Sequence, residues 1–441
     1  MRDETAIAIR GVRVIDPYRH IDSEQEEVWV VNGRIAPEPI KNLEAKVIDA
    51  RGLWLVPRLL DMHVHFREPG QTWKETIATG SRAAAHGGIT AVAVMPNTVP
   101  VTDTPELVEW VQMRGRAMGL VDVLPLGAVS VGSQGQELAD LGRMHESGAR
   151  GFSDDGKPVA SARLMRAALS YAKSLGSVII DHAEDPSLSE GALLHEGRMA
   201  HRMGLSAVPE VSEASMVWRD VLLAGLTGGA LHIAHISAQD SLEALAYAKA
   251  KGYAVTAEVA PHHLLLTESV LEQWGYDPVT KVNPPLRPEK TRQALIAAVA
   301  KGLIGVMASD HAPHHADEKA QPYTDAPFGI SGLETVVSSL ITALIAPGHL
   351  TPLKGFELMT TGPDQVLGLR YPGLCAGAPA DLALIDPERR WRVDPQDFYS
   401  LGHNTPLSGM TLIGQPLFTM VNGRFSMREG EVVDAGISQV S

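Results

Sequence analysis

The stretch "LLDMHVHF", residues 59–66, is a short apolar run that ends in two histidines, and its pattern recurs along the chain. Segments with helical spacing separate it from further runs, each of which also ends in polar residues or is followed by them. These runs are "GITAVAVMPN", "VDVLPLGAV", "GARGFSDD", "GSVIIDHAE", "ALHIAHIS", "YAVTAEVAPHH" and "LIGVMASDHAPH". About eight strand–helix repeats predict an α/β fold with a (β/α)₈ TIM barrel over residues 57–368.

Both ends of the chain have a different character from the middle. "AIAIRGVRVID" and "EEVWVVNGRIA" near the start alternate apolar and polar residues between Gly and Asn turns. "PADLALIDPERRWRV", "QPLFTMVNGRF" and "GEVVDAG" repeat this style near the end. Such alternation is typical of β-strands. We therefore expect a small β-sandwich domain built from residues 1–56 and 369–441.

The composition is that of a soluble globular protein, with 44% hydrophobic and 20% charged residues in a chain of 441. A net charge of -14 argues against nucleic acid or an anionic membrane as the main partner. No run is long enough to span a bilayer, and the first residues lack the apolar core of a secretory signal. Cys375 is the single cysteine, which fits a reducing cytoplasm and excludes a cysteine-rich metal site. We expect a cytoplasmic protein.

Metal-capable side chains follow several of the apolar runs. The carboxyl ends of parallel barrel strands meet on one face, so residues distant in sequence converge there. The candidates are His63, His65, Asp155, His182, His235 and Asp310. Histidine and carboxylate together suit zinc. Six ligands exceed one tetrahedral site, so the sequence predicts a centre with two Zn²⁺ ions per subunit, about 3.5–4 Å apart.

Strand geometry gives these residues their predicted directions. Side chains alternate along a strand, so His63 and His65 point to the same side, and Arg67 continues that series. His232 lies three residues before His235 and is therefore predicted to face away and to pack. In "GFSDDGKPV", residues 151–159, alternation allows only one of the two adjacent aspartates to face the metals.

The motifs "DMHVHFREPG", "VMPNT", "EVAPHHLLLT", "KVNPPLR" and "ASDHAPH" make the chain resemble the dihydroorotase family of the amidohydrolase superfamily, bacterial class I type. The likeness extends over nearly the whole chain, including "APFGISGLET" and "NTPLSGMTLIGQ". It implies the reversible cyclisation of N-carbamoyl-L-aspartate to (S)-dihydroorotate in de novo pyrimidine biosynthesis.

The resemblance also implies a role for each site residue. His63 and His65 would bind the first metal, His182 and His235 the second, and Asp155 would bridge the two, which leaves Asp154 as a turn or supporting residue. Asp310 would be both a ligand and the catalytic proton shuttle. The substrate-binding residues would be His65, Arg67, Asn97, Asn283, His314 and the backbone around Phe328 and Gly329. Arg67 makes chemical sense, because a guanidinium binds a carboxylate through two parallel hydrogen bonds.

In the hydrolytic direction we expect a metal-activated hydroxide to attack the ring amide, with Asp310 passing its proton to the departing nitrogen. The stretch "HAPHHADEKAQPYTDAPFGISG", residues 311–332, reads as a long loop. Loops of this length in compact domains are usually functional, and this one is placed to close over the site.

Two other classes of protein compete with this interpretation. Hydantoinases, dihydropyrimidinases and allantoinases resemble the chain, but they bridge their metals with a carbamylated lysine on the fourth strand. Here aspartates stand at that position, and Lys157 lies beyond the expected strand end. A non-catalytic partner of aspartate carbamoyltransferase would lack metal ligands, whereas all six are present. We expect an enzyme that forms a homo-oligomer; association with aspartate carbamoyltransferase stays open.

Overall fold

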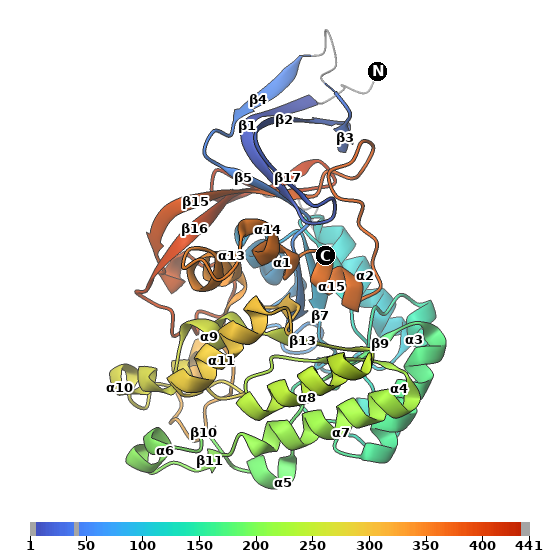
Figure 1. Ribbon diagram of the computed structural model, residues 1–441, viewed down its shortest axis with the longest axis vertical. Coiled ribbons are helices and arrows are strands. Elements are labelled where there is room, and N and C mark those ends of the chain that lie inside the picture. The colour runs from blue at the N-terminus through green and yellow to red at the C-terminus, as the bar shows by residue number, and fades with distance from the viewer. Residues whose placement is uncertain (1–5, 39–43, 434–441) are drawn as a thin grey trace.

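The computed structural model describes residues 6–38 and 44–433. In Figure 1, strands from the start of the chain (blue) and from its end (red) lie together at the top, and the barrel with its helices lies below them. The predicted run "GEVVDAG" forms only the short strand β18 (Glu431–Val432), and its residues 434–436 lie outside the described part of the chain.

The barrel is built from parallel strands in sequence order. They are β6 (Leu60–Val64), β7 (Ala91–Val94), β8 (Asp122–Pro125), β9 (Val178–Asp181), β12 (Ala230–Ile233), β13 (Val255–Val259) and β14 (Val306–Met307). The ring closes where Val64 pairs in parallel with His311, beyond the end of β14. This is the eight-membered barrel that the repeating runs predict, with one member altered.

The altered member is the fourth, where "GARGFSDD" forms no regular strand. Phe152 alone fills the gap, pairing in parallel with Gly127 on one side and Ile179 on the other. The chain bends straight afterwards because the Asp154 carboxylate accepts hydrogen bonds from the backbone amide of Val129, 2.9 Å away, and from that of the next residue. The prediction of a full fourth strand is therefore wrong in extent, although the position in the ring is right.

Helices surround the barrel as the sequence predicts. The longer ones are α1 (Ile77–His86), α2 (Pro105–Met118), α4 (Ala162–Leu175), α7 (Val211–Thr227), α8 (Gln239–Lys251) and α11 (Glu289–Ala300). The shorter ones are α3 (Leu141–Glu146), α5 (Pro186–Ser189), α6 (Arg198–Met203), α9 (Pro261–Leu265), α10 (Leu271–Trp274), α12 (Ala316–Lys319), α13 (Val336–Leu340), α14 (Pro352–Glu357) and α15 (Thr361–Val366). Thr104 caps α2 by accepting from the Leu107 amide, and Pro105 occupies the first helical position, where its missing N–H costs no hydrogen bond. Of the described helices, none combines the length and the apolar character that crossing a membrane requires.

The two ends of the chain form one nine-stranded sheet. Its order is β18, β17 (Arg424–Arg428), β16 (Thr411–Val421), β15 (Leu382–Arg392), β5 (Trp54–Pro57), β1 (Ala6–Asp16), β2 (Ile21–Val31) and β3 (Arg34–Ala36), with β4 (Ala45–Asp49) paired to β1. The antiparallel pair β5–β15 joins the N-terminal and C-terminal strands. Ile9 and Leu55 share a buried core with Leu384 and Met420, which stabilises the union of the two ends. The limits 1–56, 57–368 and 369–441 stay predictions.

Candidate metal centre and active site

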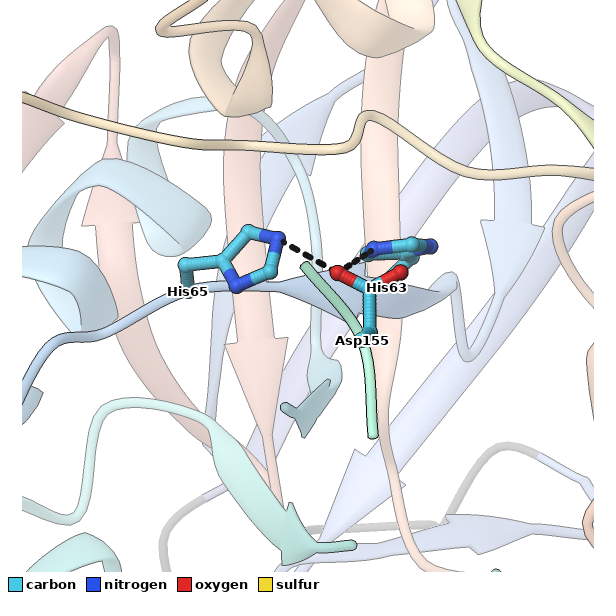
Figure 2. A group of neighbouring side chains, drawn as sticks. All are labelled: His63, His65 and Asp155. Atoms are coloured by element: carbon cyan, nitrogen blue, oxygen red, sulfur yellow. Dashed lines mark ion pairs between the residues drawn. The ribbon is translucent and has the colours of Figure 1, made fainter. Parts of the chain in front are cut away.

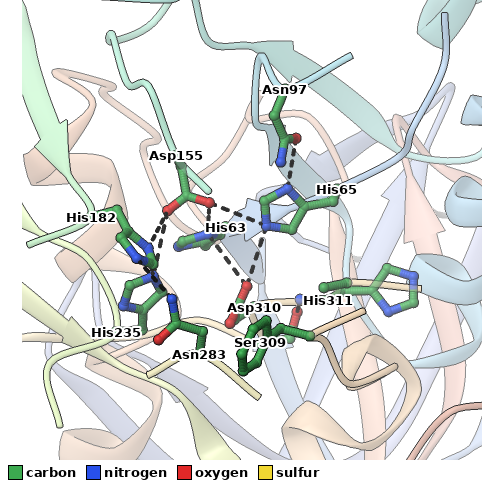
Figure 3. A network of polar contacts seen from close by, with 12 residues as sticks. His63, His65, Asn97, Asp155, His182, His235, Asn283, Ser309, Asp310 and His311 are labelled. Carbon is green, nitrogen blue, oxygen red and sulfur yellow. Dashed lines mark hydrogen bonds and ion pairs between the residues drawn. The ribbon is translucent and has the colours of Figure 1, made fainter. Parts of the chain in front are cut away.

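Six side chains meet at the carboxyl ends of the barrel strands (Figure 3). They are His63 in β6, His65 just beyond it, Asp155 after the bridging Phe152, His182 directly after β9, His235 after β12 and Asp310 after β14. All six are buried. These are the six residues that sequence reasoning selected as metal ligands, and the fold brings them into one cluster.

Asp155 lies at the centre of the cluster and faces two pairs of histidines. Its Oδ2 lies 3.4 Å from Nε2 of both His63 and His65, and Figure 2 shows the two rings on either side of that oxygen. Its Oδ1 lies 3.6 Å from Nδ1 of His182 and 3.4 Å from Nε2 of His235. One carboxylate therefore serves two separate groups of ligand atoms, each of which could hold a metal ion.

On the His63 and His65 side of the cluster, the distances suit ligand atoms around one cation; on the other side, His182 Nδ1 and His235 Nε2 lie 2.9 Å apart, at hydrogen-bond distance. Ligand atoms bound tetrahedrally to one zinc ion lie roughly 3.3–3.4 Å from each other. Asp310 Oδ1 lies 3.5 Å from His63 Nε2 and 3.3 Å from His65 Nε2, which matches this spacing. Within the described part of the chain, His63 Nε2 and Asp155 Oδ1 are buried without a hydrogen-bond partner. Burying a polar atom without a hydrogen-bond partner or a metal costs free energy of folding. The residues present therefore fit a metal on each side of Asp155.

Both carboxylates of the cluster are ionised. Burial favours the neutral form of Asp155, but the neighbouring imidazoles, His63 foremost, outweigh burial and hold its pKa well below the usual range. Burial likewise opposes ionisation of Asp310, and His63 and His65 more than compensate, so the pKa of Asp310 is also lowered. Two negative charges surrounded by imidazoles form a cation-binding site.

Three of the four histidines have a partner on the nitrogen that points away from the cluster. His63 Nδ1 donates to Glu258 Oε1 at 2.5 Å, and His65 Nδ1 donates to Asn97 Oδ1 at 2.8 Å. His182 Nε2 donates to a carboxylate two residues along the chain, at 2.8 Å. Each contact fixes the tautomer and leaves the lone pair of the other nitrogen free for a metal.

Sequence reasoning missed the two carboxylates in this set. They are Glu184, which accepts from His182, and Glu258, which accepts from His63. Glu258 is buried in β13, and its Oε2 also accepts from Nε2 of His232 at 3.2 Å. His232 therefore faces away from the metal ligands and supports one of them indirectly, in keeping with its predicted packing role. An acidic residue inside the apolar run "AVTAEVA" was the available signal, because an unpaired buried carboxylate is rare.

We expect Glu258→Gln to weaken metal binding about 10–100-fold, because the loss of the negative charge behind His63 lowers the basicity of that ligand. The measurement is a titration of metal-free protein with Zn²⁺ against a chelating dye. Asp364→Asn is the matched control: Asp364 is buried, but its carboxylate accepts from the Tyr371 amide rather than from an imidazole. Equal zinc affinity in the two variants would contradict a supporting role for Glu258.

Arg67 reaches the site by a different route from the predicted one. Strand β6 ends at Val64, and Arg67 has a φ of +59°, so strand alternation does not place it. Its side chain is nevertheless buried, with Nη2 3.4 Å from His314 Nε2. Burial lowers the pKa of Arg67 to about 10, which leaves the guanidinium charged at neutral pH. The two residues thus lie together beside the metal cluster.

The remaining predicted substrate-binding groups have protein partners in this state. Asn283 Nδ2 donates to Glu184 Oε2 at 2.7 Å. The Phe328 carbonyl accepts from His314 Nε2 at 2.8 Å. The Gly329 amide donates to the Lys281 carbonyl at 3.0 Å. Asn283 and Phe328 line one cavity together with Glu184 and Lys281.

Three residues of the site have an unusual backbone conformation. His235 and Asp310, like Arg67, have positive φ values, +30° and +49° respectively. Side chains other than glycine rarely adopt this conformation, and strained residues cluster at active sites. Strand β6 also contains an irregularity between Asp61 and Val64, and bulges of this kind re-aim side chains. Neither feature can be read from residue spacing.

The three charged side chains of residues 151–159 lie in different surroundings. Asp155 enters the metal cluster, whereas Asp154 is bound to the amides of Val129 and Ser130. Lys157 is exposed. The geometry therefore offers no carbamylated lysine at the bridging position.

The chain is similar to known cyclic-amide hydrolases in sequence. A family model described as Dihydro-orotase-like matches residues 52–241. A dihydroorotase from Pelotomaculum thermopropionicum is 48% identical over 426 residues, which cover 96% of this chain and 99% of that protein. A dihydroorotase from Geobacillus kaustophilus is 45% identical over 393 residues, 89% of this chain and 91% of that protein.

Solved structures confirm the architecture. The L-hydantoinase (dihydropyrimidinase) from Arthrobacter aurescens matches with a TM-score of 0.84 and 27% identity, covering 97% of both chains. A dihydropyrimidinase from Brevibacillus agri matches with the same TM-score of 0.84, covering 98% of this chain and 97% of that one, and at 22% identity it shows the shared fold alone. The predicted barrel with a terminal β-domain is thereby confirmed. The sequence relatives confirm the predicted family as well: the chain belongs to the dihydroorotase family of cyclic-amide hydrolases.

Proposed function

We propose that the protein interconverts N-carbamoyl-L-aspartate and (S)-dihydroorotate, using two zinc ions per subunit. The observation that carries this proposal is the Asp155 carboxylate between two histidine pairs, with Arg67 beside it. The sequence relatives named dihydroorotase support the reaction. Aspartate at the bridging position, in place of a lysine, separates the chain from the hydantoinase pattern.

The cluster divides its ligands between two metals. His63, His65 and Asp310 would hold the first, His182 and His235 the second, and Asp155 would contact both. When bound, such ions lower the pKa of water and polarise a carbonyl oxygen. The protein's own contribution is to keep three of the four imidazoles, those of His63, His65 and His182, in the tautomer that presents a lone pair, through the partners on their far nitrogens.

The substrate side of the site is built to hold an anion. The Arg67 guanidinium would bind the substrate carboxylate through two hydrogen bonds, with Asn97 and Asn283 alongside. His65 and His314 would contact the same end of the substrate. The backbone of Phe328 and Gly329 would face the ring. When substrate binds, the Phe328 carbonyl and the Gly329 amide would exchange their present protein partners, His314 and Lys281, for the substrate.

Asp310 would move the proton. Its Oδ1 faces the space between His63 and His65, at 3.5 and 3.3 Å from their Nε2 atoms. In the hydrolytic direction it would accept a proton from the attacking water and donate it to the ring nitrogen as the amide bond breaks. In the reverse direction it would take the proton from the carbamoyl nitrogen. A single carboxylate thus acts as base and then as acid.

The proposed enzyme acts on a small molecule. The single cysteine supports a cytoplasmic location, and we propose a homo-oligomer as its working state. Light scattering during gel filtration measures the subunit number. The same experiment with added aspartate carbamoyltransferase tests whether the two proteins associate.

We expect the enzyme to prefer dihydroorotate to dihydrouracil, hydantoin and allantoin by at least ~100-fold in kcat/KM, because the last three lack the carboxylate that would pair with Arg67. Arg67→Lys should raise the KM for dihydroorotate roughly 10–100-fold, since lysine cannot make the paired contact. Steady-state kinetics with each compound make the comparison. Turnover of dihydrouracil or hydantoin without turnover of dihydroorotate would instead assign the hydantoinase activity of the structural relatives.

A further inference from the structure

A buried asparagine from the C-terminal part of the chain binds both segments that carry the predicted substrate-binding groups. Asn404 lies in the connection between β15 and β16. Its Nδ2 donates to the Ala312 carbonyl at 3.2 Å and to the Gly329 carbonyl at 2.9 Å. Its Oδ1 accepts from the His314 amide and from the Ser331 hydroxyl, both at 3.0 Å. All four side-chain hydrogen-bonding positions are occupied.

These contacts fix the spacing of residues 312–314 and 329–331. The two segments also meet directly, because a Cβ placed on Gly329 would lie 2.6 Å from the Ala312 carbonyl oxygen. Gly329 has a φ of +140°, which favours glycine and brings the backbones into contact. A side chain at position 404 must offer two hydrogens to carbonyls on one side and accept two on the other. A primary amide does this in a small volume, whereas a carboxylate would face the two carbonyls with oxygen atoms.

The segment that presents Asn404 is itself fixed to the barrel. Glu75 is fully buried, and it accepts from the Ser400 hydroxyl at 2.5 Å and from the Leu401 amide at 3.3 Å. Glu334, also buried, accepts from the backbone amides of Tyr399 and Ser400. Two buried carboxylates thus hold the chain a few residues before Asn404. Asn404 therefore lies in a segment whose backbone is held in place by buried hydrogen bonds.

We propose that Asn404 is a positioning residue that sets the distance between the His314 segment and the Gly329 segment. The C-terminal part of the chain thereby completes the substrate side of a site whose metal ligands all come from the barrel. Asn404 touches neither the metal ligands nor the proposed position of the scissile amide, so its effect passes through the groups that bind substrate. This inference rests on the proposed function.

The test compares Asn404→Asp and Asn404→Ala with Ser338→Ala. Ser338 is the matched control, because it also links the barrel to the terminal sheet, accepting from Trp391 Nε1 at 3.1 Å and donating to the Gly414 carbonyl at 2.5 Å. Both Asn404 variants should raise the KM for dihydroorotate about 10–100-fold, since small misplacements of binding groups have effects of this size. Their kcat should stay within about threefold, with zinc content unchanged. Ser338→Ala should leave KM unchanged.

Two results would overturn the inference. One is a folded Asn404 variant, by circular dichroism and Tm, whose KM stays within twofold of the wild-type value. The other is a parallel loss of zinc and kcat, which would show a general structural role. If neither variant folds, Ser331→Ala removes one of the four contacts and should still raise KM about threefold; an unchanged KM then counts against the inference. A wild-type chain inactive on dihydroorotate overturns the proposed function instead, and the same KM comparison then proceeds with dihydrouracil.

Discussion

Asp155→Ala is expected to abolish the binding of at least one zinc ion and to lower kcat about 10³–10⁴-fold. Both histidine pairs lose the carboxylate that they share, whose Oδ2 lies 3.4 Å from Nε2 of His63 and His65 and whose Oδ1 lies 3.4 Å from Nε2 of His235. Metal ions contribute several kcal/mol to the transition state, and each 1.36 kcal/mol corresponds to a tenfold change in rate. Zinc content by mass spectrometry and kcat on dihydroorotate measure the two effects.

Lys157→Ala is the control for this prediction, because Lys157 lies two residues further along the same turn and is the residue that a carbamate-bridged enzyme would need. Its side chain is exposed, whereas that of Asp155 is buried among the histidines. The substitution should leave zinc content and kcat unchanged. If Lys157→Ala lost metal and activity while Asp155→Ala kept both, the bridging role would pass from the aspartate to the lysine.

The barrel and its six ligands could be predicted because they depend on local pattern and on one topological rule. Each apolar run identifies a strand, and parallel strands in a closed barrel bring their carboxyl ends together. His182 and His235 lie 53 positions apart, yet their facing nitrogens are 2.9 Å from each other. The convergence of the strand ends is enough to predict that they meet. The fold class brings the candidate ligands together, whereas the choice of Asp155 over Asp154 came from the resemblance to the dihydroorotase family.

The supporting residues could not be predicted, because they depend on which strands are neighbours in detail and on backbone irregularities. Glu258 supports His63 across 195 positions of sequence, and Asn404 binds the His314 segment from another part of the chain. The resemblance selected Arg67, but the direction predicted for it from strand alternation is wrong, since β6 ends at Val64 and Arg67 has a positive φ. Periodicity describes a regular strand, and the site lies where the strands stop being regular.

Asp310→Asn is expected to lower kcat about 10²–10⁴-fold in both directions of the reaction, with a much smaller change in KM. An asparagine keeps an oxygen facing His63 and His65, so the first metal retains a neutral ligand, but an amide cannot accept and return a proton. The neighbouring histidines hold the carboxyl of Asp310 in its ionised form, as a proton acceptor requires. Because one group would serve as base in one direction and as acid in the other, ring closure and ring opening must slow equally.

The matched control for Asp310→Asn is Asp317→Asn, which makes the same chemical change at a side chain that is 90% exposed in α12 of the same loop. It should leave both rates unchanged. Rates of dihydroorotate hydrolysis and carbamoyl-aspartate cyclisation, measured on zinc-loaded protein with its metal content determined, separate loss of proton transfer from loss of metal. An Asp310→Asn variant with both metals and with kcat within tenfold of the wild-type value would assign the proton transfer to another group. Because the equilibrium constant fixes the ratio of the two kcat/KM values, that ratio should be the same in the variant and in the wild-type protein.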